Sequence, residues 1–522
     1  MRRFLFLNRK LSAVATAAAL LACSASTVMA EQSGKITVAL GSLGFETFLP
    51  EEGSIAGHVY WDPIYDYMFY EGKDGAVDPG LIEKWVLAED KVTWMFHVRK
   101  GVKFHNGREL DAADIVYNFN SWITSSQSKH NVTTVLTKSI DTVKETGKYT
   151  VEVKLKQPQA LFIQWLSEAA SAVVVPREYG EMDPVQAREN PIGTGPWKFV
   201  SRSLGERAVF SATSAHWRQT PEFKELELRA VPEPSTRLAM LKRGEADVID
   251  VPLSFKRELD GQPFDIARAE DAFSAYVFFT GMYQDKEAPA YNPDLPWRNL
   301  KVRQALNLAI NRQAIADHIF QGEARPAAVP LPLPSHIGYK KSWAAPAYDP
   351  EKAKKLLAEA GYADGFEIEL MSFPRPGVPD IPLMIEAVAD LWSRIGVKVK
   401  IVKTDWGAIR PAVRARKVTY AAPLTQGKSN PDVMAILIGA PFYMFTISPE
   451  LNEAVSDVKS AGTAEEMSSA LGDLGDQMQA ASAVVPVALL NQVYATNPKK
   501  IAAWPVKAHQ GGANGFEFIK KK

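Results

Sequence analysis

Side chains that carry out catalysis or bind metals occur in this chain, but not in the patterns that such chemistry requires. The eight histidines are scattered, with no helically spaced pair and no carboxylate motif of a zinc site. The sequence contains no Gly-x-Ser-x-Gly nucleophile motif, no metalloprotease helix and no phosphate-binding loop. The acids Glu51-Glu52 and Glu465-Glu466 are adjacent in sequence, which is typical of solvated charges. We therefore expect neither an enzyme nor a cofactor, although histidines that meet only in the folded chain stay open as a metal site.

Cysteine content and charge exclude further classes of protein. Cys23 is the single cysteine of the 522 residues, which argues against a disulfide framework and against a cysteine nucleophile. Acidic and basic residues balance to a net charge of zero, so no basic excess indicates nucleic acid binding and no polybasic run indicates anionic lipid. With 46% hydrophobic and 23% charged residues, the composition is that of an ordinary globular protein, and the length predicts two or three domains.

The first thirty residues have the three-part pattern of a secretory signal peptide. Arg2, Arg3, Arg9 and Lys10 precede an apolar stretch at 11–22. Val28-Met29-Ala30 then supplies small or compatible residues at the two positions that a signal peptidase reads. This stretch is too short to span a bilayer, and no later one reaches the roughly 18 apolar residues of a spanning helix. We expect cleavage after Ala30 and export to the periplasm. The alternative is a lipid anchor at Cys23, because Leu20-Leu21-Ala22-Cys23 resembles a lipobox.

Strand and helix patterns alternate along the rest of the chain, which predicts an α/β architecture. Strands with period-2 alternation are typical of sheets with one face exposed to water. Helices are indicated by apolar stripes, by an Asp-Pro start and by glycine ends. Strands are predicted at 35–40, 93–99, 149–156 and 397–401, and helices at 302–319, 349–361 and 383–395.

Five short segments of turns, helix caps and aromatic residues follow one another over most of the chain. They are Gly80–Val116, Gly193–Phe199 with His216-Trp217 downstream, Thr236–Asp247, Val302–Arg312 and Tyr348–Tyr362. In the first, Gly101 and Gly107 permit tight turns before a helix that Asp111 can cap. In this order the segments resemble the extracellular solute-binding proteins of family 5, the peptide-, nickel- and opine-type receptors of ABC importers.

The resemblance implies a two-lobed α/β fold of the periplasmic-binding-protein (Venus-flytrap) type, with an extra subdomain inserted in lobe I. Lobe I would comprise 31–55, 188–266 and 486–522, the inserted subdomain 56–187, and lobe II 267–485. A small solute would bind between the lobes, and hinge closure would bury it. The partners would be this solute and an ABC permease in the inner membrane, and the receptor would act as a monomer.

Aromatic side chains are the first candidates for ligand contacts, since their faces bind many kinds of solute. Trp406 directly follows a predicted strand of lobe II, where such chains approach the cleft. Trp61, Tyr276 and Tyr443 are further candidates. For each of them the alternative is a place in the core. The motif residues Arg303 and Asp114 and the 193–196 turn are expected to hold the scaffold instead.

The stretch Thr425–Asp432 departs from the resemblance. Peptide-binding members have a segment like Trp-x-x-Asp-Tyr-x-Asp-Pro, whose acid pairs with the ligand's α-amino group. Here the aromatic residue is missing, and Lys428 stands at or beside the position of the acid, with Asn430 close by as a second candidate contact. Two unpaired ammonium groups repel each other, so we expect a neutral or anionic solute. The alternative is that Lys428 faces solvent and Asp432 anchors an amine.

The function predicted from these observations is that of the substrate-binding component of an ABC importer. An exported hydrolase is the alternative from another class, against which the missing catalytic motifs argue. A receptor of the same fold that reports its ligand to a sensor, or that chaperones unfolded chains, also stays open.

Overall fold

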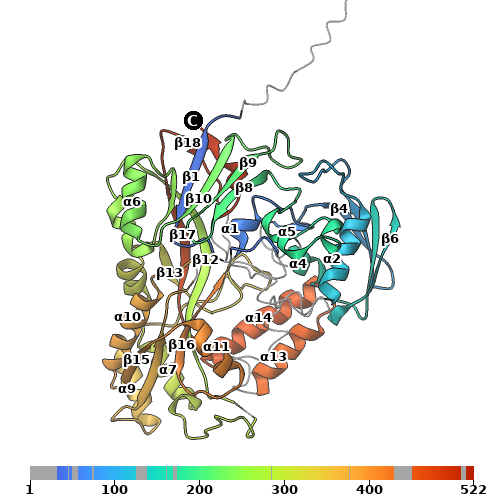
Figure 1. Ribbon diagram of the computed structural model, residues 1–522. Coiled ribbons are helices and arrows are strands. Elements are labelled where there is room, and N and C mark those ends of the chain that lie inside the picture. Colours follow the sequence, from blue (N-terminus) through green and yellow to red (C-terminus); the bar gives the residue numbers. More distant parts are fainter. Residues whose placement is uncertain are drawn as a thin grey trace, which may run out of the picture. The chain divides into compact units, whose positions relative to one another are not determined.

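Alternating apolar residues build one large mixed sheet in this computed structural model, in the strand order β15-β14-β16-β12-β17-β11-β1-β10-β9-β8, with β13 paired to β17 (Figure 1). The structure describes residues 32–44, 46–49, 57–72, 76–124, 138–159, 161–167, 173–283, 285–375, 377–427, 449–506 and 513–522. The strands of this sheet are β1 (Lys35–Leu40), β8 (Trp197–Ser203), β9 (Arg207–Ala212), β10 (Glu225–Ala230), β11 (Val248–Asp250), β12 (Asp265–Phe279), β13 (Ala324–Pro326), β14 (Glu367–Ser372), β15 (Lys398–Lys403), β16 (Ala421–Gly427) and β17 (Val484–Thr496).

Two long strands, β12 and β17, connect the halves of this sheet. Their antiparallel pairing covers both ends, from Asp265↔Thr496 to Phe278↔Val484, with a break in register between Ala269 and Phe273. On one side of the break β17 also pairs with β11. On the other side β12 pairs with β16. Each half therefore has its own neighbouring strands, and only β12 and β17 pass through both.

The first strand differs from its sequence-based prediction. The alternation at 35–40 indicated a strand with one wet face, but both Thr37 and Ala39 are buried. The reason is that β1 lies inside the sheet, parallel to β10 on one side and to β11 on the other. Parallel strands of this kind are covered on both faces.

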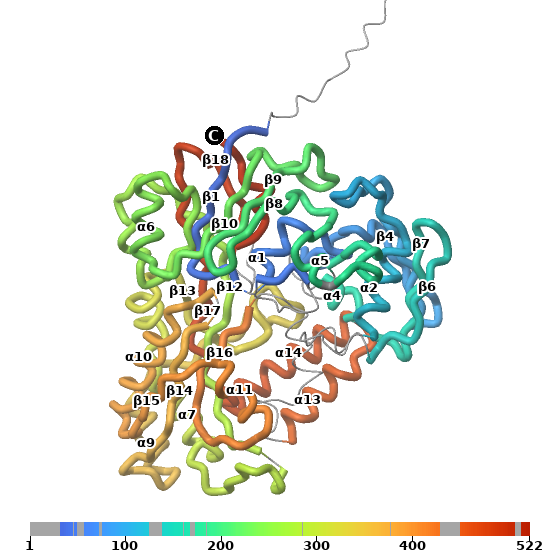
Figure 2. The backbone as a smooth tube through the Cα atoms, in the orientation of Figure 1, coloured from blue at the N-terminus to red at the C-terminus, as the bar shows by residue number. Residues whose placement is uncertain are grey.

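Helices cover both faces of the sheet, and alternate residues of β12 show the two layers. Val277 and Phe279 pack in a cluster with apolar residues of α7 (Leu300–Leu308), α9 (Pro350–Glu359) and α10 (Ile381–Ser393). Tyr276 and Phe278 pack in a second cluster with residues of α11 (Trp406–Arg414), α13 (Pro449–Ser460) and α14 (Ala464–Ala480). Figure 2 shows α9 and α10 on one side of β16, and α13 and α14 on the other.

A separate antiparallel sheet, in the order β4-β5-β7-β6, contains β4 (Ile82–Leu87), β5 (Thr93–Val98), β6 (Ile140–Gly147) and β7 (Thr150–Leu155). Helix α2 (Ala112–Thr124) packs on β6 and β7. The remaining elements are α1 (His58–Trp61), β2 (Phe69–Glu71), β3 (Val77–Pro79), α4 (Phe162–Ser167), η5 (Arg177–Gly180), α5 (Pro184–Glu189), α6 (Pro234–Arg243), η6 (Leu253–Leu259), η7 (Pro296–Arg298), α8 (Arg312–Ala314), η8 (Ile315–Ile319), β18 (Ile501–Ala503), η9 (Phe516–Phe518) and β19 (Lys520–Lys521). Within the described ranges, no helix has the length and apolar character needed to cross a membrane.

The helix predicted over 302–319 is wrong as a single element. Helix α7 ends at Leu308, and the chain turns before α8 begins at Arg312. Asn311 has a non-helical backbone conformation, and its side chain accepts a hydrogen bond from the Ala314 amide. An Asn cap of this kind starts a new helix, which the apolar spacing alone did not indicate.

Candidate functional site

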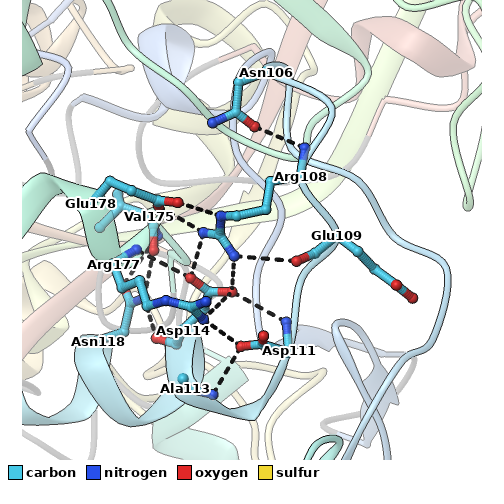
Figure 3. Close-up of polar contacts among 10 residues, drawn as sticks. All are labelled: Asn106, Arg108, Glu109, Asp111, Ala113, Asp114, Asn118, Val175, Arg177 and Glu178. Carbon is cyan, nitrogen blue, oxygen red and sulfur yellow. Dashed lines mark hydrogen bonds and ion pairs between the residues drawn. The ribbon is translucent and has the colours of Figure 1, made fainter.

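Several polar clusters hold the scaffold, and the best defined lies at the start of α2 (Figure 3). Arg108 makes a two-pronged contact with the buried Asp114, at 2.8 and 2.7 Å, and also donates to Glu178 at 2.7 Å. Asp114 accepts from the Arg177 amide at 3.1 Å. Asp111 accepts from the Ala113 amide, as expected of a cap. These contacts join the loop before α2 to η5, and protein donors occupy both oxygens of the buried Asp114, as expected of a residue that holds the scaffold.

Asp66 is the centre of a second buried cluster. Its carboxylate accepts hydrogen bonds from Tyr70 at 2.8 Å and from Thr194 at 3.0 Å. The His216 ring nitrogen lies 2.9 Å away, and the indole of Trp217 donates at 2.8 Å. The charge and hydrogen bonds of these neighbours outweigh burial and hold the pKa of Asp66 well below its usual range. This cluster fixes the second sequence segment, with its Gly-Thr-Gly turn and His-Trp pair, against the chain after α1.

A third group of polar and aromatic residues lies where β14 and β16 end. These strands are parallel, and ligands of open α/β sheets bind beyond the carboxyl ends of such strands. Arg375 follows β14, and its Nε donates to Thr425 Oγ1 of β16 at 3.3 Å. Its guanidinium lies 5.4 Å from the ring centre of Trp406 at the start of α11. Trp406 in turn stacks on Phe373, with ring centres 6.0 Å apart.

Tyr276 belongs to the same neighbourhood. It is only 1% exposed, and burial raises the pKa of its hydroxyl well above the ordinary value, with the charge of Arg375 acting in the opposite direction. Its hydroxyl is therefore neutral at physiological pH. Two residues earlier in β12, Ser274 pairs with Gln426 of β16, and both are buried. The Ser274 hydroxyl and the Gln426 side-chain nitrogen have no hydrogen-bond partner within the described part of the chain. This part of the sheet thus has donors available to a bound solute or an ordered water.

The structure brings two of the predicted contact residues together and places a third elsewhere. Tyr276 and Trp406 both lie near Arg375, which the sequence analysis did not single out. Trp61 is buried in α1, where its indole donates to the Thr47 carbonyl at 2.7 Å. Lys428, Asn430 and Tyr443 lie outside the described residues. No three histidine, cysteine or acidic side chains gather as a metal site in the described ranges.

Comparison with known proteins identifies the family. Residues 76–438 match the family model "Bacterial extracellular solute-binding proteins, family 5 Middle". The chain belongs to this family. It is 32% identical over 403 residues to the dipeptide-binding protein of Escherichia coli K12, covering 71% of this chain and 72% of that one. It is 30% identical to heme-binding protein A of Haemophilus influenzae, covering 72% and 71%.

Solved structures show the same fold. Brucella suis NikA in complex with Fe(III)-EDTA matches with a TM-score of 0.79 and 19% identity, over 94% of this chain and all of that one (100%). The Pseudoalteromonas dipeptide-binding protein in complex with Met-Leu matches with a TM-score of 0.76 and 20% identity, over 94% and 100%. The two-lobed periplasmic-binding-protein fold is confirmed. As a family 5 member, the chain is a substrate-binding component of an ABC importer.

Charged residues surround the break in register of β12 between Ala269 and Phe273. Asp271 has a left-handed φ of 49°, and Arg325 holds its carboxylate by two contacts at 2.9 and 2.8 Å. Arg268, before the break, makes a similar pair with Glu323, with contacts of 2.8–3.0 Å. Asn491 of β17 links both pairs, because it donates to Glu323 and accepts from the Asp271 amide. The sequence gives no signal for this cluster, whose members come from three chain segments.

We expect Arg325→Met to increase local opening of the backbone at the break in register of β12, without unfolding the protein. Arg325 and Asp271 are partly exposed, so their pair contributes about 1 kcal/mol or less. Amide hydrogen exchange at 269–273 is therefore expected to become about two- to fivefold faster. Lys354→Met, which removes an exposed ion pair with Glu351 on α9, is the matched control and leaves this exchange unchanged. Unaltered exchange in Arg325→Met would show that the pair does not restrain the break.

Proposed function

We propose that this receptor captures a small organic solute bearing a carboxylate, at the group formed by Tyr276, Arg375, Trp406 and Thr425, and delivers it to the permease of its importer. The observation that carries the proposal is the position of Arg375. Just after the carboxyl end of β14, its guanidinium is held by the Thr425 hydroxyl, near the end of β16, and by the Trp406 ring. A planar guanidinium recognises carboxylates by paired hydrogen bonds, and stacking on a ring orients it for this role.

The compounds bound by related proteins, and the groups around Arg375, also support a solute that carries a carboxylate. The names of related proteins mention dipeptides and glutathione, and the receptor from Agrobacterium tumefaciens was solved with agropinic acid. All of these compounds carry carboxylates. In this protein the neutral hydroxyl of Tyr276 is a hydrogen-bond donor that adds no charge near the ligand. The Trp406 ring offers an apolar face beside the cation.

The proposal extends to where and how the protein acts. The family and its relatives are binding proteins, and we infer that this chain likewise binds its solute without chemical turnover. We infer export to the periplasm after removal of residues 1–30, with a lipid anchor at Cys23 as the alternative. Release to the permease would follow opening at the break in β12, since a ligand shifts an equilibrium only by its preference for one state.

Lys428, whose candidate role rests on the sequence, offers a test of which solute charge the receptor prefers. If Lys428 faces the solute, Lys428→Glu is expected to weaken binding of an N-acetylated dipeptide about tenfold and to improve binding of the free-amine dipeptide. Calorimetric titration of both peptides against both proteins measures this. Lys417→Glu, a change of an exposed lysine on the turn after α11, is the control. Equal affinities in wild type and Lys428→Glu would place Lys428 away from the solute.

A thermal-shift screen tests the proposed function as a whole. The compounds are dipeptides, N-acetylated and amidated dipeptides, opines, sugar acids, neutral oligosaccharides and nickel chelates. A ligand at 100 times its dissociation constant stabilises the fold by about 2.7 kcal/mol, which raises the melting temperature measurably. We expect hits among the carboxylates. Hits confined to uncharged sugars or to amidated peptides would contradict the proposal.

A further inference from the structure

A cavity among the helices that pack on the large sheet shares no lining residue with the Arg375 group. It has a volume of about 370 Å³ and lies between α7, α9, the 328–346 segment and the end of α14. Much of its wall is apolar and includes Leu308, Val329, Leu356, Met478 and Val484. This volume is within the roughly 300–1,000 Å³ that small-molecule sites occupy.

A buried arginine supports the cavity wall. Arg312 is 3% exposed, and its Nε donates to the Pro486 carbonyl at 2.7 Å. Its Nη1 donates to the carbonyls of Asn307 and Pro346 at 3.0 and 3.1 Å, and its Nη2 to Asn307 Oδ1 at 2.9 Å. Asn307, Pro346 and Pro486 all line the cavity. The charge of Arg312 therefore lies directly behind this wall.

A second buried arginine, Arg303 of α7, is linked to Arg312 of α8 through Asn307. Arg303 is 4% exposed and donates to the carbonyls of Ala481 and Trp297 at 3.0 and 2.8 Å. Its own carbonyl accepts from the Asn307 side chain, which also contacts Arg312. Burial lowers the pKa of Arg303 to about 10 and that of Arg312 to about 9, so both stay protonated at neutral pH.

The charges around the cavity do not balance. In the described part of the chain neither arginine has a carboxylate within ion-pair distance, and carbonyl oxygens neutralise no charge. Lys352 is the one charged side chain among the lining residues. Asp349, at the start of α9, is an acid next to the lining residue Lys352, whose amide donates to its Oδ1 at 2.9 Å. Its one negative charge is outnumbered by the three positive charges of Arg303, Arg312 and Lys352. The wall therefore has an excess of positive charge, which favours a negatively charged occupant.

We propose that this cavity is a second binding site, for an amphiphilic monoanion such as a medium-chain carboxylate. The alkyl chain packs against the apolar wall, and the carboxylate lies near Lys352 and Gln304 in the field of Arg303 and Arg312. Burial of the chain supplies most of the affinity, while the positive charge selects the anion over neutral or cationic analogues. The proposal is independent of the solute that the Arg375 group binds.

Three ligands of equal chain length test this charge selection on the full-length purified protein. Octanoate, octanol and octylamine are titrated by isothermal calorimetry at neutral pH and low salt. We expect octanoate to bind at least tenfold more tightly than octanol, and octylamine not to bind. Equal binding of octanoate and octanol, or no octanoate binding, would overturn the proposal.

Variants locate the site. Lys352→Glu is expected to weaken octanoate binding about tenfold, whereas Lys355→Glu, on the same helix but outside the cavity, leaves it unchanged. Ala344→Phe fills part of the cavity from its rim and is expected to abolish octanoate binding without lowering the melting temperature. Arg375→Met retains octanoate binding. Loss of binding in Arg375→Met, or full binding in Lys352→Glu and Ala344→Phe together, would place octanoate elsewhere.

Discussion

Replacing Asp66 with asparagine is expected to lower the free energy of unfolding by about 3–5 kcal/mol. The carboxylate is fully buried and accepts from Tyr70, Thr194 and Trp217, with His216 at 2.9 Å and Arg218 at 3.6 Å. Removing its charge leaves the Arg218 guanidinium without one of its acidic partners, and the amide turns a donor toward groups that are themselves donors. Urea denaturation at pH 7 measures the loss. Asp90→Asn, an exposed acid, is the control.

The same variant has a defined pH dependence. Because the folded-state pKa of Asp66 is depressed, its stabilisation is fully present above the unfolded value of about 3.9 and is lost as the pH falls through the lower folded value. The difference in stability between wild type and Asp66→Asn should therefore be constant from pH 7 to about 5 and shrink below about 4. A difference that grows on acidification would mean that another group dominates the cluster.

Replacing Arg375 with methionine is expected to weaken binding of a carboxylate solute about 100-fold or more. Truncating one member of a desolvated charge pair costs about 2–5 kcal/mol of binding free energy. Arg375→Lys keeps the charge but loses the planar fork, so it should recover only part of the affinity. The melting temperature of the unliganded protein is the control for folding. Affinity that is unchanged in Arg375→Met would remove the carboxylate assignment.

Local sequence signals predicted the elements whose ends depend on single residues. Asp349-Pro350 begins α9, and the Asp349 side chain caps it as expected. Gly361, where the predicted helix ends, follows α9 in the left-handed conformation that glycine favours. The apolar stripe at 302–319 failed because the Asn311 cap interrupts the helix, and burial of both faces of β1 depends on its neighbours in the sheet. The division of the chain into lobes and an inserted subdomain stays a prediction.

The candidate site could be predicted only in part, for a physical reason. Trp61 and Trp406 carry the same sequence signal, an aromatic residue beside an element, but one is fully buried and the other packs near a cation. Arg375 acquires its role from Thr425 and Trp406, which lie 50 and about 30 residues away in the chain. Such a group exists only after β14 and β16 have paired in the sheet, so no local pattern marks it.

Calorimetric titration of three forms of one dipeptide tests directly whether Arg375 binds the carboxylate of the solute. Met-Leu, N-acetyl-Met-Leu and Met-Leu amide differ only in which end carries a charge. We expect N-acetyl-Met-Leu to bind at least as tightly as Met-Leu, and Met-Leu amide to lose most of the affinity because this ligand offers Arg375 no carboxylate. Tight binding of the amide, together with loss of binding on acetylation, would contradict it.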